Sequence, residues 1–218
     1  MPQAPTSEHH YLLRYTKTGA ARYLSLHDVR RAWERATRRA GLPLAYSQGF
    51  SPKPRLSFGP PLAVGDEGLR ECLVISLREL LPPRAVHERL TAAAVDGLSP
   101  RELAQVSRRK FTTVWAAYTL SLHDPPANLP TRVDMLLSED AVPVARPPRS
   151  GRASQTRDIR PGIQRLEARD GTQLEAQLSL RNGCIVTPRD LASALNITLH
   201  RTVRTEVEIR LPECMKPA

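Results

Sequence analysis

The sequence contains little of several residue types, and each shortage excludes a class of protein. Only three of its 218 residues are cysteine, and they lie far apart with no C-x-x-C motif: Cys72, Cys184 and Cys214. This pattern argues against a disulfide framework and against a self-contained zinc or iron–sulfur site, so we expect no metal and no cofactor. No apolar run approaches about 18 residues, so we expect no membrane span. The opening MPQAPTSEHH lacks the charged and apolar segments of a signal peptide, which predicts a cytoplasmic protein.

Acidic residues are also scarce, and the formal net charge is +10. Between Arg14 and Arg55 the chain has ten Lys or Arg residues against two acidic ones. Between Arg146 and Arg165 it has six Arg against one Asp. Compositional bias explains why Arg outnumbers Lys, but it does not explain why the basic residues are clustered. The clusters favour a polyanionic partner such as RNA.

The first half of the chain predicts the element order β-α-β-β-α-β. A helix with Ser25 as its N-cap carries Val29, Ala32, Trp33 and Ala36 at helical spacing, and Gly41 would end it. The expected strands are 11–17, 56–64, 71–77 and 102–107, and the second helix lies within 82–97. Such an order is typical of a ferredoxin-like sandwich, in which both helices cover one face of an antiparallel sheet.

The second half repeats this order more weakly, so we predict an α+β protein of two tandem ferredoxin-like units. The predicted divisions are a flexible tail at 1–10, a first domain at 11–110 and a second domain at 111–218. The second domain is expected to contain strands at 113–122 and 172–180, a helix capped by Thr187, and a long Arg-rich loop at 146–170. We expect Trp33 and Trp115 to pack in the cores of the two domains.

The stretch AYSQGFSPKPRLSFGPPL, residues 45–62, is unusually rich in proline. Pro52 and Pro54 lack the backbone donor of a central strand, which predicts an extended and exposed segment. Lys53 and Arg55, two positions apart, would then project to the same side. A rigid backbone with converging donors suits phosphate binding. The alternative is a stiff loop that only leads into the next strand.

These patterns give one set of candidate RNA-binding residues. The helix contributes its outward arginines, the proline-rich stretch contributes donors, a turn glycine and an aromatic ring for stacking, and the Arg-rich loop contributes two further arginines. The set is Arg22, Arg31, Arg35, Arg38, Arg39, Ser47, Gly49, Phe50, Lys53, Arg55, Arg157 and Arg160. Tyr46 is a second ring that could stack on a base.

Residues 22–65, RYLSLHDVRRAWERATRRAGLPLAYSQGFSPKPRLSFGPPLAVG, closely resemble the bacterial family called radical SAM-linked proteins. The matching features are the helix start, the R-A-G-L-P helix end and the Y-S-x-G-F-x-P-K-P-R-L-S-F run. This chain has SLHD where the family usually places His directly after Ser, so His27 is shifted by one position. The resemblance implies a radical SAM protein as partner. The chain has no C-x-x-x-C-x-x-C motif, so it would be the companion of the radical enzyme.

Two functions follow from these observations. The first is a non-catalytic RNA-binding or substrate-presenting accessory protein that works with a radical SAM partner. Single-stranded RNA is preferred over duplex DNA because no recognition-helix motif is present. The sheet also lacks the aromatic RNP1 pattern, so binding need not follow the RRM mode.

The second function is a metal-independent endoribonuclease of the kind that processes CRISPR transcripts. His27 would act as the general base and Lys53 would stabilise the transition-state charge, if the two side chains lie close together. The C-terminal segment has no glycine-rich loop of the type found in those enzymes, so the non-catalytic function is preferred.

Overall fold

The computed structural model describes residues 8–146 and 155–211 and divides the chain into two compact units. Unit 1 contains residues up to Thr112 together with those from Ile209 onward, and unit 2 is Thr113–Glu208. Both units combine helices with sheets, so the protein is of the α+β class. Residues 1–7 of the predicted tail and 147–154 of the predicted Arg-rich loop lie outside the described residues. In the part that the structure describes, no helix is long and apolar enough to cross a membrane.

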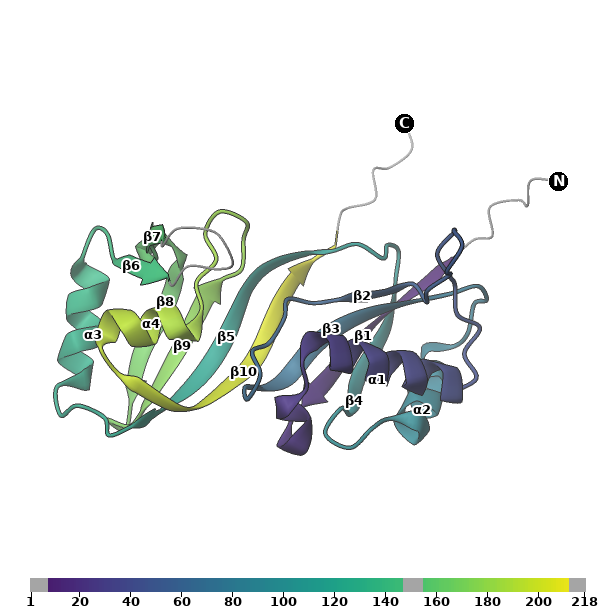
Figure 1. The fold of residues 1–218 in the computed structure, drawn as a ribbon, viewed down its shortest axis with the longest axis horizontal. Coiled ribbons are helices and arrows are strands. Elements are labelled where there is room, and N and C mark those ends of the chain that lie inside the picture. The colour runs from purple at the N-terminus through teal and green to yellow at the C-terminus, as the bar shows by residue number, and fades with distance from the viewer. Residues whose placement is uncertain (1–7, 147–154, 212–218) are drawn as a thin grey trace. The chain divides into compact units, whose positions relative to one another are not determined.

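Unit 1 has the element order that the sequence predicts, with one added 3-10 helix. Its sheet has the order β4-β1-β3-β2, and every pair of neighbours is antiparallel. Helices α1 and α2 cover the same face of this sheet (Figure 1). The elements are β1 (His9–Lys17), η1 (Gly19–Tyr23), α1 (Leu26–Arg39), β2 (Leu56–Phe58), β3 (Glu67–Leu77), α2 (Pro83–Ala93) and β4 (Pro100–Val106).

Helix α1 is oriented by one apolar stripe. Val29, Ala32, Trp33 and Ala36 recur at the spacing of a helical face, and all four are buried. Trp33 is only 1% exposed, and its ring packs edge-on against Tyr15 with the ring centroids 5.1 Å apart. Because this stripe faces the sheet, the opposite side of α1 faces solvent.

Both ends of α1 follow the predicted signals. The backbone N–H of Asp28 donates to the Ser25 hydroxyl, and that hydroxyl donates to the Asp28 carboxylate at 2.6 Å. This hydrogen bond from Ser25 lowers the pKa of Asp28. Gly41 has a φ of +62°, a left-handed conformation that favours glycine and ends the helix.

The predicted tail at 1–10 is wrong for its last two residues, which belong to β1. His9 and His10 pair with Leu77 and Ser76 of β3. The Nδ1 atom of His10 lies 3.0 Å from the Ser76 hydroxyl. Burial is the main cause that lowers the pKa of His10. The start of this strand is polar, so the sequence around it did not indicate a strand. Its pairing partner lies 66 residues away in the sequence.

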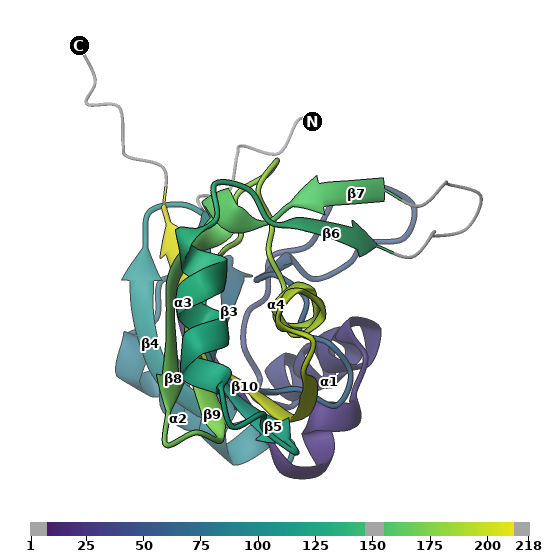
Figure 2. The same cartoon turned by 90° about the vertical axis from the view of Figure 1, so that its left-hand side faces the viewer.

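Unit 2 contains a four-stranded sheet and a separate two-stranded hairpin. The strands of the sheet have the order β10-β5-β9-β8. Helices α3 and α4 contact one another and lie in front of β8 and β9 in Figure 2. The elements are β5 (Thr112–His123), α3 (Leu129–Ser138), β6 (Pro143–Arg146), β7 (Gln155–Asp158), η2 (Arg160–Gly162), β8 (Ile163–Arg169), β9 (Gln173–Ser179), α4 (Pro188–Leu195) and β10 (Thr198–Arg210).

The predicted long loop at 146–170 is wrong over residues 155–169. These residues form β7, η2 and β8. β7 pairs with β6, and β8 pairs with β9. The open face of β8 carries Arg165, Glu167 and Arg169, which are linked by ion pairs. A strand whose exposed side is fully charged has the composition of a loop, which is why the sequence did not reveal it.

We predict that residues 1–112 fold without the rest of the chain, because they contain strands β1 to β4, helices α1 and α2 and the whole core cluster of unit 1, and they lack only its segment from Ile209 onward, where β10 ends. The isolated fragment should unfold in one cooperative transition when far-ultraviolet circular dichroism is followed against urea concentration. A fragment with no cooperative transition would show that the two units share one core.

Candidate nucleic-acid interface

The outward side of α1 carries a group of exposed arginines. Arg31, Arg35 and Arg38 are spaced by three and four residues, so they lie on one side of the helix, away from Trp33. Within residues 8–146 and 155–211, none of the three forms an ion pair. Their charges are therefore available to a ligand.

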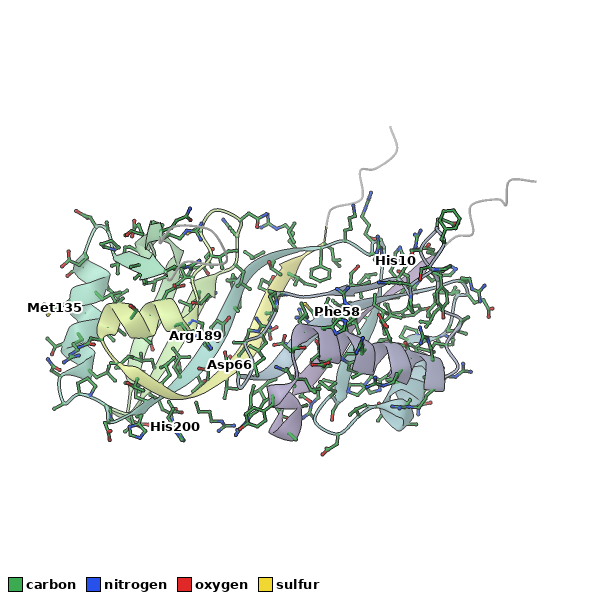
Figure 3. The ribbon with its side chains drawn as sticks, viewed as in Figure 1. His10, Phe58, Asp66, Met135, Arg189 and His200 are labelled. Carbon is green, nitrogen blue, oxygen red and sulfur yellow. The ribbon has the colours of Figure 1, made fainter. Side chains whose placement is uncertain are left out.

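Two further arginines of α1 are partly committed. The guanidinium group of Arg30 lies over the Phe58 ring of β2, 5.4 Å from its centroid, and Figure 3 shows Phe58 beside this helix. Arg39 donates to the carbonyl oxygen of Ala93 at 2.6 Å, at the end of α2. These contacts help to fix the helix, while the side chain of Arg39 remains exposed.

The proline-rich stretch forms a narrow excursion that returns to the sheet. Its base is held because Ala45 donates to Ser76 and accepts from Arg55 through their backbones. Higher up, the Ser47 N–H donates to the Lys53 carbonyl at 2.9 Å, and the Lys53 N–H donates to the Ser47 hydroxyl at 3.0 Å. The residues between Ser47 and Lys53 form the tip of this stretch. We call the whole stretch the proline loop. Its backbone is therefore shaped before any ligand arrives.

The tip of the proline loop is open to solvent. Gly49 has a φ of +130°, which favours glycine and permits the turn. Phe50 is fully exposed, at 112% of its reference area. Lys53 is exposed as well, whereas Pro54 is buried. The prediction that both prolines are exposed is therefore correct for Pro52 and wrong for Pro54, which forms an isolated bridge with Tyr46.

Arg55 does not stand beside Lys53 as a second free cation. Its Nη1 atom lies 2.7 Å from the Glu8 carboxylate, and its Nε donates to the Tyr46 carbonyl at 3.1 Å. The Arg55 side chain is only 31% exposed. The two side chains were expected together because an extended backbone alone would project them to the same side, but Glu8, from the start of the chain, pairs with Arg55.

Arg22 is also committed to the fold. It donates to the Tyr23 hydroxyl at 2.6 Å and lies 3.3 Å from the Glu67 carboxylate. The hydrogen bond with Tyr23 is the main cause that raises the pKa of Arg22. We therefore assign Arg22 to the structure of the η1 segment.

The structure does not bring His27 and Lys53 together. His27 lies in the first turn of α1, which follows the Lys17 end of β1. Lys53 belongs to the proline loop, whose base pairs with β3 at the other end of the same strands, beside His9. A strand of nine residues spans about 25 Å, so these side chains cannot form one general-base site. In the described residues, no group of three or more His, Cys, Asp and Glu could hold a metal ion.

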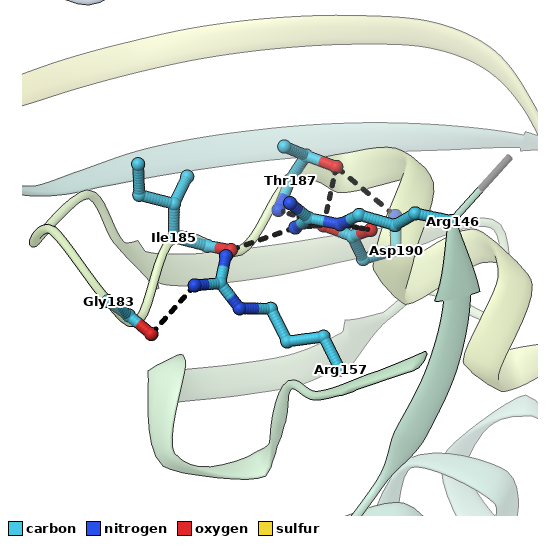
Figure 4. A network of polar contacts seen from close by, with 6 residues as sticks. All are labelled: Arg146, Arg157, Gly183, Ile185, Thr187 and Asp190. Carbon is cyan, nitrogen blue, oxygen red and sulfur yellow. Dashed lines mark hydrogen bonds and ion pairs between the residues drawn. The ribbon is translucent and has the colours of Figure 1, made fainter. Parts of the chain in front are cut away.

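Arg157 and Arg160 stabilise unit 2 through backbone carbonyls. Arg157 donates to the Gly183 carbonyl at 2.8 Å (Figure 4). Arg160 donates twice to the Leu137 carbonyl, at 2.8 and 3.2 Å, and so satisfies an acceptor at the end of α3. Their predicted contact with RNA remains a prediction, but each guanidinium group already has a structural partner.

Arg146, at the start of the second basic cluster, also has partners within the protein. It forms a two-pronged ion pair with Asp190, at 3.0 and 2.6 Å, and donates to the Ile185 carbonyl. Asp190 also accepts from the backbone and the hydroxyl of Thr187, which completes the predicted cap of α4 (Figure 4). The network links the β6–β7 hairpin to α4, and the charge of Arg146 is neutralised by Asp190 within the protein.

The prediction that Trp115 packs in a core is wrong. Trp115 is half-buried and lines a cavity of about 430 Å³ at the sheet of unit 2. Its neighbour Ala116 is fully buried, as is Leu120. Side chains of a strand alternate between its two faces, and Trp115 is directly next to the buried Ala116. This alternation was the signal that could have placed Trp115 on the other face.

A family model described as "Uncharacterized protein conserved in bacteria (DUF2344)" matches residues 10–188. The chain belongs to this family. The DUF2344 match includes α1 and the proline loop, and it ends at the first residue of α4. The family description states no activity, and it says nothing of radical SAM proteins. A search of curated proteins finds no match to the chain.

Arg160→Ala should lower the free energy of unfolding by about 1 kcal/mol, because it removes two charged hydrogen bonds that are partly open to water. Arg189→Ala is the matched control, since Arg189 is exposed at the start of α4. Urea denaturation of both variants checks the difference. Equal stability of the two would show that the Leu137 contact contributes nothing.

Proposed function

We propose that this DUF2344 protein is a non-catalytic RNA-binding or substrate-presenting accessory protein. One observation carries the proposal: the exposed arginines of α1 have no ion-pair partner in the described residues, and the same unit presents a preshaped loop with an exposed aromatic ring. The arginines supply charge and the loop supplies a stacking surface. Both features are needed to hold an unpaired strand.

The arginines of α1 would bind phosphate groups. Each guanidinium group presents several donors that match phosphate oxygens, and its charge is retained at all physiological pH values. Arg31, Arg35 and Arg38 lie on a helix that is held by the core. Binding would therefore cost the entropy of ordering these side chains but not that of ordering the backbone. Phosphate contacts of this kind provide affinity without reading sequence.

Phe50 would provide the stacking surface. A fully exposed phenylalanine at a loop tip contributes nothing to the core, so its apolar ring is available to a partner. An unpaired base can stack on such a ring whatever its identity. The backbone contacts between Ser47 and Lys53 hold the loop that presents the ring, which reduces the entropy lost on binding.

The fold agrees with single-stranded RNA as the ligand. We infer that each unit is a ferredoxin-like sandwich, since the strand orders β4-β1-β3-β2 and β10-β5-β9-β8 both follow that arrangement. Sheets and loops of such sandwiches suit unpaired strands, whereas a duplex groove calls for an inserted helix or ribbon.

A radical SAM partner belongs to the proposal through the resemblance of residues 22–65 alone. The chain has no C-x-x-x-C-x-x-C motif, so any such chemistry would belong to the partner. The protein would then present RNA, or a substrate attached to it, to that enzyme.

Replacing Arg31, Arg35 and Lys53 together with Ala should weaken the binding of unrelated RNA sequences about equally. The slope of log affinity against log salt should become shallower by about 2 units, because each lost phosphate contact on a single strand removes about 0.7. Fluorescence anisotropy over a salt series measures both quantities. A triple variant of three exposed arginines elsewhere, Arg89, Arg101 and Arg189, is matched in charge and should retain more of the slope. Equal slopes in the two triple variants would contradict a defined binding face.

Phe50→Ser should weaken RNA binding by roughly fivefold or more while leaving the salt slope unchanged, because it removes stacking but no charge. Its thermal midpoint should equal that of the wild-type protein, since the ring touches no core residue. Unchanged affinity at every salt concentration would exclude Phe50 from the interface.

A further inference from the structure

The sheet of unit 2 has a cavity of about 430 Å³ that the basic face of α1 does not explain. Its walls come from β5, β8, β9 and β10, and its volume lies in the range of small-molecule sites. Ala117 pairs with Gln177 of β9, and Gln177 pairs in turn with Arg165 of β8. The small side chain of Ala117 leaves space in the middle of this row, and Trp115 lies two positions along the same face.

The charges around this cavity cancel. Arg165 lies 2.7 Å from Glu167, and Arg169 lies 3.0 Å from Glu167 and 3.3 Å from Glu175. Two arginines therefore face two glutamates. The ion pair with Glu167 is also the main cause that raises the pKa of Arg165. A phosphate group would compete with these carboxylates, so the cavity favours an uncharged ligand.

The polar groups of the lining suit the edge of a planar ring. The Gln177 amide offers both a donor and an acceptor, and within the described residues it has no side-chain hydrogen bond. Thr119 adds a hydroxyl group on the same strand as Trp115. A ring for stacking beside hydrogen-bond donors and acceptors is the combination that recognises an unpaired base.

We infer that the Trp115 cavity binds one unpaired nucleobase of an RNA strand. The inference rests on the proposed function, because it assigns a base of the same class of ligand to unit 2. A peptide side chain is less suitable, since the lining beyond Trp115 and Ala117 is largely polar. The two units would then divide the work: α1 holds phosphate groups, and the sheet of unit 2 holds a base.

The test compares two ligands on three proteins. The ligands are a short unstructured oligouridylate and an abasic ribose-phosphate oligomer of equal length. The proteins are the full-length wild type, Trp115→Leu and Trp115→Phe, measured by anisotropy in one buffer. Trp115→Leu should bind the oligouridylate roughly 5- to 100-fold more weakly, because a stacked base is lost. Its affinity for the abasic oligomer should not change. Trp115→Phe retains a ring and should stay within a few-fold of the wild type.

Thermal melts of both variants distinguish a lost site from a lost fold, because Leu and Phe both fill an apolar position. If Trp115→Leu binds oligouridylate as the wild type does, while the Arg31, Arg35 and Lys53 variant binds it weakly, the inference is wrong and the proposed function stands. An equal loss for both ligands, or a loss that Trp115→Phe shares in full, also overturns the base site. If the wild type binds neither ligand, both proposals fail. Binding of a protein instead of RNA at this face would give that last result.

Discussion

The burial of Trp33 against Tyr15 is the packing contact on which the rest of unit 1 depends. It fixes the rotation of α1 about its axis, since Val29, Ala32 and Ala36 follow the same stripe into the core. Once that rotation is fixed, the arginines of the opposite side have to face solvent. The binding face that we propose is thus a consequence of how the core packs, and it would turn away if the stripe were shifted by one position.

The same antiparallel sheet also positions the proline loop. β1 pairs with β3 from His9 to Lys17, and the chain after α1 returns to the His9 end of that pair. The loop therefore projects beyond the strand ends, held by backbone contacts between Ser47 and Lys53. Glu8 neutralises Arg55 at its base, which leaves Lys53 and the Phe50 ring as the features it presents. The prolines restrict the backbone of this loop, and the restricted backbone holds Lys53 and the Phe50 ring in place.

Much of the fold could be predicted because its signals are local. The Ser25 and Thr187 caps, the Gly41 end of α1 and the apolar stripe through Trp33 each depend on residues within one or two turns. The predictions that failed needed partners far away in the sequence. Arg160 looks like a free cation until the end of α3 lies beside it, and His9 looks like part of a tail until it pairs with Leu77.

The candidate site shows the same division. The free arginines of α1 could be predicted, since helical spacing alone separates them from the core. The sequence could not show which other arginines already have partners within the protein. Residues far away in the sequence neutralise or hydrogen-bond four of them: Arg22, Arg55, Arg146 and Arg157. Charge in the sequence thus overestimates charge at the surface. Trp115 was missed for a different reason: its residue type suggested a core, while its strand parity indicated the open face.

Hydrogen exchange measured by mass spectrometry, with and without a saturating unstructured RNA, is the most direct test of RNA binding by α1 and the proline loop. We expect slower exchange in the proline loop and in α1 of the RNA-bound protein, with little change in α2, which lies outside the proposed face. The loop is the more sensitive probe, since its residues 48–51 are exposed in the free protein. Protection confined to α2 or β4, or no protection anywhere at saturation, would contradict the assignment of RNA binding to this face.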